Sequence, residues 1–131
     1  MNRIEKLLTQ TRAIFFYNET ANIMKKVTLY ITRSENNPQN YLVVVNGEGF
    51  YNSVGKTVAA RIRGDDEWFD DKLFSIGVGG FFHVGVDGSF GVSEEVDHNR
   101  LNEDWGRDEI YALVDVEGDG TYKSNTVTGN F

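Results

Sequence analysis

Hydrophobic and polar residues alternate with a period of two along most of the chain after Lys25. Successive side chains of a β-strand point to opposite faces, so this alternation predicts half-buried strands rather than helices. The apolar positions that follow it are Val27, Leu29, Ile31; Val58, Ala60, Ile62; Phe82, Val84, Val86; Phe90, Val92; and Ile110, Ala112, Val114, Val116.

Two further segments predict strands without clear alternation. Tyr41–Val45 is a continuous apolar run, which is typical of a strand buried on both faces. Gly47 and Gly49 follow it and predict a bulge or a close backbone approach. Leu73–Val78 predicts a strand that ends at the adjacent pair of glycines, Gly79-Gly80.

Turn signals separate the segments. Asp87-Gly88 lies between two alternating runs and predicts a tight hairpin, and Asp119-Gly120 leads into a last strand region, Thr121–Val127. Asp97–Arg107 is too long and polar for a tight turn, so we expect it to cross between two sheets. Together these signals predict an all-β, antiparallel sandwich of about seven to eight strands, with a small barrel as the alternative.

Residues 25–131 form the predicted domain, and residues 1–24 differ in pattern. Ile4, Leu7 and Leu8 begin a spacing that fits a short amphipathic helix, with a disordered segment as the alternative. No apolar stretch typical of a signal peptide follows the early basic residues. A further hypothesis is that the true chain starts at Met24, directly before the first strand pattern.

The turn motifs resemble those of bacterial immunoglobulin-like modules. The resemblance rests on Val45-Asn46-Gly47-Glu48-Gly49-Phe50, Val54-Gly55-Lys56-Thr57-Val58, Asp87-Gly88-Ser89-Phe90 and Ser124-Asn125-Thr126-Val127, and it spans Lys25 to Phe131. It implies an immunoglobulin-like sandwich that serves as a spacer, adhesive part or accessory domain without chemistry of its own. It also suggests a location at the cell surface or outside the cell.

Composition excludes several classes of protein. The chain has 131 residues and no cysteine, so disulfide scaffolds, thiolate metal sites and cysteine nucleophiles are ruled out. No apolar run is long enough to span a bilayer. The net charge is −7, and residues 65–119 hold 16 of the 20 acidic residues but only 3 of the 13 basic ones. A nucleic-acid partner needs a basic surface, so we expect none.

Clustered carboxylates make calcium the first candidate ligand, because calcium prefers six to eight oxygen ligands. The acidic loops predict three groups of carboxylate ligands. The simpler alternative is that the same residues form turns and keep the protein soluble. The candidate metal ligands are Asp65, Asp66, Asp70 and Asp71 in one loop, Asp104 in another, and Asp115, Glu117 and Asp119 in a third.

Aromatic residues among these acids suggest a carbohydrate or other ligand as a second interpretation. Trp68, Trp105 and Tyr51 are the candidate ligand-binding residues, although large aromatic side chains more often belong to a core. A third interpretation is an acidic inhibitor that mimics DNA and blocks a basic partner. It would require the acids to lie on one continuous face.

Catalysis has little support in the sequence. His83 alternates outward in its predicted strand, and His98 lies beside Asp97 in the predicted crossover. No serine stands in a recognisable nucleophile motif, and the glycine-rich stretches precede no predicted helix. We interpret Arg61 and Arg63 as part of a solvated strand face rather than as a phosphate-binding site. We therefore expect a non-catalytic binding or structural module without a certain cofactor, as a monomer or weak dimer.

Overall fold

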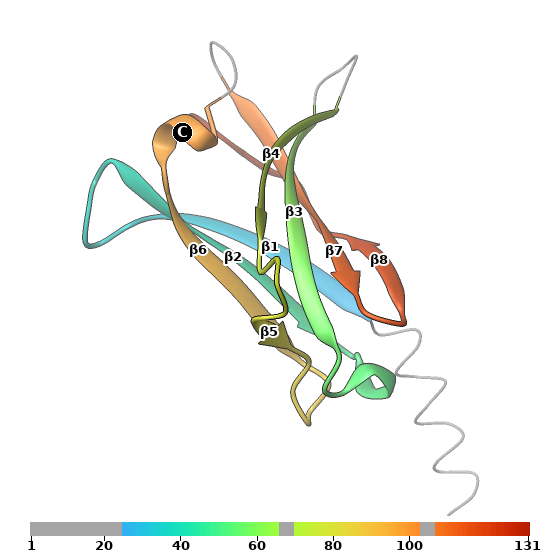
Figure 1. The fold of residues 1–131 in the computed structure, drawn as a ribbon. Coiled ribbons are helices and arrows are strands. Elements are labelled where there is room, and N and C mark those ends of the chain that lie inside the picture. Colours follow the sequence, from blue (N-terminus) through green and yellow to red (C-terminus); the bar gives the residue numbers. More distant parts are fainter. Residues whose placement is uncertain (1–24, 66–69, 103–106) are drawn as a thin grey trace, which may run out of the picture.

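The computed structural model describes residues 25–65, 70–102 and 107–131, and these form two antiparallel β-sheets packed face to face (Figure 1). Sheet A has the order β1-β2-β6, with β1 at Lys26–Arg33, β2 at Asn40–Glu48 and β6 at Phe90–Asp97. Sheet B contains β3 at Thr57–Asp65, β4 at Asp70–Ile76, β5 at Phe82–His83, β7 at Asp108–Val116, β8 at Gly120–Lys123 and β9 at Val127–Gly129. The all-β sandwich predicted from the alternation is therefore confirmed.

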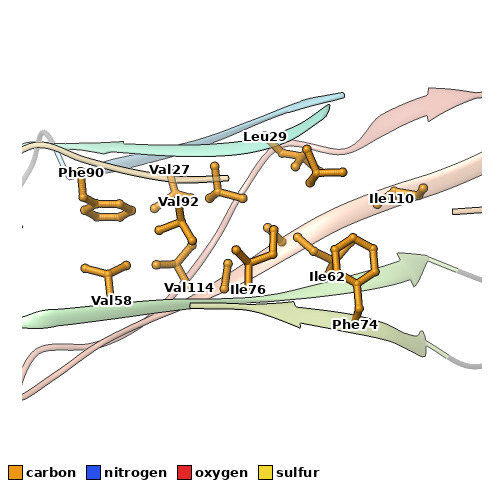
Figure 2. Close-up of a cluster of buried hydrophobic side chains, with 14 of the residues drawn as sticks. Val27, Leu29, Val58, Ile62, Phe74, Ile76, Phe90, Val92, Ile110 and Val114 are labelled. Carbon is orange, nitrogen blue, oxygen red and sulfur yellow. The ribbon is translucent and has the colours of Figure 1, made fainter. Parts of the chain in front are cut away.

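The alternating apolar side chains meet between the two sheets. In Figure 2, Val27, Leu29 and Val92 of sheet A face Val58, Ile62 and other residues of sheet B across a filled interior. The central positions of β3 and β7 exclude solvent almost completely. Complete burial of such an aliphatic side chain stabilises the fold by about 1.5–3 kcal/mol, so this interior is the main source of stability.

The run Tyr41–Val45 differs from its prediction. Tyr41, Val43 and Val45 are buried between the sheets, but Leu42 is exposed and Val44 is only partly buried. The prediction of a strand covered on both faces is therefore wrong. In the part of the chain that the structure describes, no second layer lies on the outer face of sheet A, so alternate residues of this apolar run remain accessible.

The Asp87-Gly88 segment is a tight turn, but it does not join two paired strands. Gly85 N donates to Ser89 O, and Gly88 adopts a φ of 77°. The flanking strands then separate: β5 pairs with β3 of sheet B, and β6 pairs with β2 of sheet A. The predicted hairpin is therefore wrong, and the turn is a corner between the sheets. Val86 at its tip is 93% exposed rather than inward-facing.

The side of the sandwich between β1 and β8–β9 is closed by side-chain hydrogen bonds. Leu29 N donates to Asn125 Oδ1 at 2.8 Å, and Asn125 Nδ2 donates to Leu29 O at 3.2 Å. The carboxamide thus pairs with the edge of β1 as a neighbouring strand would. Ser124 accepts a bond from Ala112 N at 2.8 Å and places Asn125 at this edge.

Two of the connections between strands contain short 3-10 turns. The segment after β6 leads from sheet A to sheet B, as expected of Asp97–Arg107, and includes the 3-10 turn η2 at His98–Arg100. A second 3-10 turn, η1 at Tyr51–Ser53, lies between β2 and β3. Across the residues that the structure describes, no helix has the length and apolarity to cross a membrane. The predictions for residues 1–24 lie outside the described residues.

Candidate functional site

A hollow of about 490 Å³ lies on the outer face of sheet A. Alternation along the strands places its principal polar lining residues on this face, because their neighbours in sequence point into the core. Those residues are Lys26, Thr28 and Tyr30 of β1, Asn46 and Glu48 of β2, and Ser89 just before β6, with Gly91 of β6 at the floor. We call this set the sheet A hollow.

Strand register sets the arrangement of groups in the sheet A hollow. Lys26 lies directly opposite Glu48, Thr28 opposite Asn46, and Tyr30 opposite Val44. Opposite charges therefore lie at one end, uncharged hydrogen-bonding groups lie in the middle, and an aromatic ring lies at the other end. The Tyr30 residue is 50% exposed, so its ring is accessible to a ligand.

Gly91 is the reason for the hollow on the β6 side. It pairs with Asn46, and its φ is not in the left-handed region, so the backbone itself does not require glycine. A Cβ at this position would lie 3.3 Å from Asn46 Oδ1. Glycine weakens a strand interior and often marks a close approach by a ligand. Its presence here keeps the surface over Asn46 open.

Gly47 has a different, structural role. A Cβ at Gly47 would lie 2.1 Å from Cε1 and Cζ of Phe90, which is buried against Phe50 at a ring-centroid distance of 5.1 Å. Gly47 is thus a point of close approach by the Phe90 side chain, and within the described part of the chain neither the predicted bulge nor a second backbone lies there. It lets the Phe90 ring pack beneath the end of the sheet A hollow.

The predicted aromatic ligand residues are only partly described. Trp68 and Trp105 lie outside the described residues. Tyr51 lies in η1 and is 38% exposed, and its ring covers Gly88, where a Cβ would lie 2.9 Å from Tyr51 Cδ1. Gly88 precedes Ser89, so Tyr51 lies beside the sheet A hollow rather than within its lining.

The predicted metal ligands of the first two groups lie around the β3–β4 connection and the segment after η2. Asp65 ends β3 opposite Asp70, the first residue of β4, and Asp71 lies opposite Gly64. Asp66 and Asp104 lie outside the described residues, as does the side chain of Asp70. A search of the described residues alone finds no group of three acidic or histidine side chains placed to hold a metal ion.

The third predicted group is divided among other partners. Asp115 accepts two hydrogen bonds from Arg61, both at 2.9 Å, and Glu117 Oε1 accepts from Thr57 N at 3.2 Å. Burial alone would raise the pKa of Asp115, but the bonds from Arg61 and Thr121 and the charge of Arg61 lower it on balance. These carboxylates serve cross-strand pairing within sheet B.

Asp119 belongs to a polar cluster at one end of the sandwich. Its carboxylate lies 3.1 Å from Lys25 Nζ and accepts bonds from Ser53 Oγ at 2.7 Å and from the Tyr122 hydroxyl. The side chains of Lys25 and Asp119 are only 14% and 10% exposed. The Lys25 ammonium also lies 5.9 Å from the centroid of the Phe50 ring. We call these four polar residues the Asp119 cluster.

The Asp119 cluster shifts the pKa values of its members. Burial would raise the pKa of Asp119, but bonds from Tyr122, Ser53 and Lys25 and the Lys25 charge lower it on balance. Burial would lower the pKa of Lys25, but its bonds to Tyr122 and Asp119 and the Asp119 charge raise it on balance. The ionised pair is thus the stable form, as expected of a structural contact rather than of a proton donor or acceptor.

The histidines lie apart from these features. His83 is exposed on β5, as its alternation predicted. Asp97 precedes His98, but its carboxylate accepts the backbone N–H of Asn99 at 2.9 Å and caps η2. The Asp97 carboxylate therefore serves a local turn in this structure.

Comparisons with protein-family models, with curated proteins and with solved structures found no match for this chain. The functional interpretation therefore rests on the residues and their geometry. The sheet A hollow was not predicted from the sequence. The available signals were the apolar run of Tyr41–Val45 and the isolated Gly91 in an alternating strand, but neither indicates which face remains uncovered.

Proposed function

We propose that this protein is a non-catalytic binding module and that its ligand surface is the sheet A hollow. The observation that carries the proposal is the open surface above Gly91, on the β6 side of a sheet face that also presents Tyr30 and Asn46. Glycine weakens a strand interior, and at position 91 it leaves the surface beside Asn46 uncovered. The proposal also includes a module of the bacterial immunoglobulin-like type and an extracellular location, and both parts rest on the sequence resemblance alone.

The charges support a binding module over an acidic inhibitor. A DNA mimic requires a continuous acidic face, whereas Asp115 is paired with Arg61, and Asp119 with Lys25. Basic and acidic segments that are separate in the sequence therefore meet in the structure. Calcium remains a sequence-based prediction for the loop that joins Asp65 to Asp71, and it would act there as a stabilising ion rather than as the main ligand.

The proposal is tested by mapping where small molecules bind. Backbone amide shifts are recorded by NMR while a panel of neutral sugars, amino acids, short peptides and nucleotides is titrated into the protein. We expect the shifted amides to cluster at residues 26–30, 46–48 and 89–91, and to lose their response in Gly91→Thr. Shifts that gather elsewhere, or chemical conversion of a panel member, would overturn the proposal.

A further inference from the structure

We infer that the ligand of the sheet A hollow is a neutral carbohydrate chain, an inference that rests on the binding function proposed above. Tyr30 supplies the first reason. Its exposed ring offers a flat apolar face, and its hydroxyl offers a polar edge. A sugar ring has the matching character, with an apolar face of C–H groups and a polar rim of hydroxyls.

The polar groups beside Tyr30 both donate and accept hydrogen bonds. The Asn46 carboxamide has two N–H donors and a carbonyl acceptor, and the Thr28 hydroxyl opposite it can do either. The Ser89 hydroxyl donates to Asp87 Oδ1 at 2.7 Å, which leaves its oxygen available as an acceptor. Each hydroxyl of a sugar also donates and accepts, so this set suits a ligand with many hydroxyls.

The charges around the hollow favour a neutral ligand. Lys26 and Glu48 face each other at one end and balance in sign. The whole chain carries a charge of −7, which would repel an anionic polymer such as a nucleic acid or a sulfated polysaccharide. The net charge does not repel a neutral ligand, and hydroxyls of such a ligand can bond to both Lys26 and Glu48.

The position and size of the hollow favour a carbohydrate chain over a peptide. An extended peptide gains most of its affinity by adding a strand to a sheet edge, whereas this hollow lies over β2, whose backbone groups bond to β1 on one side and to β6 on the other. Strand geometry gives the hollow a length of about 13 Å along β1, from Lys26 to Tyr30, and a width of about 10 Å across three strands at the row of Thr28, Asn46 and Gly91. That area suits a short oligosaccharide rather than a single ring.

Affinity electrophoresis of the whole chain through gels with soluble β-glucan, xylan, mannan or starch tests the inference. We expect at least one of these polysaccharides to retard the protein, and the matching oligosaccharide to reverse the retardation. Tyr30→Ala should weaken the association about tenfold, whereas Tyr30→Phe should retain most of it. Gly91→Thr should abolish the retardation, and Ser93→Thr, on the same face outside the hollow, should leave it unchanged.

The outcomes separate this inference from the function on which it rests. Retardation by none of the polysaccharides overturns the carbohydrate assignment. If the NMR panel then shows peptides shifting the amides of the sheet A hollow, the binding function stands and the ligand class is wrong. Carbohydrate binding that persists in a folded Gly91→Thr protein places the carbohydrate site elsewhere and overturns both the site and its assignment. Failure of every panel member to shift these amides overturns the binding function as well.

Discussion

Replacing Asp119 by asparagine removes the only negative charge of the Asp119 cluster while keeping its shape. Lys25 Nζ then lies in a nearly buried position without its carboxylate partner at 3.1 Å, and the hydroxyls of Ser53 and Tyr122 donate to a weaker acceptor. Removing one partner of a buried ion pair costs about 3–5 kcal/mol. Lys25 precedes β1 at the rim of the sandwich and can turn toward solvent, so we expect a loss of about 2–3 kcal/mol.

Urea unfolding followed by circular dichroism measures this loss, with an unchanged slope against urea as the sign that the fold is intact. Asp115→Asn is the matched control, because the side chains of Arg61 and Asp115 are 38% and 44% exposed. An exposed pair contributes less than about 1 kcal/mol. Combining Asp119→Asn with Lys25→Met should show a coupling of at least about 1 kcal/mol. Equal losses in Asp119→Asn and Asp115→Asn would refute the reasoning.

The pKa shifts in the Asp119 cluster also predict how the stability difference between wild type and Asp119→Asn depends on pH. The folded-state pKa of Asp119 is lowered, so its contribution is present above the ordinary carboxyl pKa and is lost as the pH falls through the folded-state pKa. The pKa values of Lys25 and Tyr122 are raised, so their contributions are lost as the pH rises through those values. The stability difference between wild type and Asp119→Asn should therefore be largest between about pH 5 and 9 and shrink on both sides.

Three further predictions test the fold and the calcium hypothesis. Asn125→Ala removes both hydrogen bonds to Leu29, so it should lower the free energy of unfolding by about 1–3 kcal/mol and speed hydrogen exchange at the Leu29 amide. Thr126→Ala, at the exposed neighbouring position, should change neither the stability nor the exchange rate. Gly47→Ala should lower stability by about 1–3 kcal/mol in thermal unfolding, because the added Cβ meets the Phe90 ring. Gly91→Ala should change stability by less than about 1 kcal/mol, because only the end of the Asn46 side chain must move. Equal losses in the two variants would contradict this account. Calcium added to EDTA-treated protein should raise the unfolding midpoint through the Asp65–Asp71 loop, a rise that Asp71→Asn removes and Asp119→Asn preserves; an unchanged midpoint rejects the calcium prediction.

Local patterns determined a large part of this fold. The alternation from Val27 to Ile31 and from Ile110 to Val116 identified strands and their inward faces, because the two-residue period of a strand is a local property of the chain. The strand predicted to end at Gly79-Gly80 already ends at Ile76, but the turn at Asp119-Gly120 between β7 and β8 was identified for the same kind of reason. Such features depend on residues that are neighbours in sequence.

Strand partners and exposed faces were decided only by the tertiary structure. Asp87-Gly88 has the composition of a hairpin turn, yet β5 and β6 obtain better pairing from β3 and β2 in different sheets. Lys25 and Asp119 meet across 94 positions of sequence, and Leu42 stays exposed because sheet A has an uncovered outer face. These outcomes depend on which distant segments bury the most apolar surface and complete the most backbone hydrogen bonds together, and that competition leaves no signal at any single position of the chain.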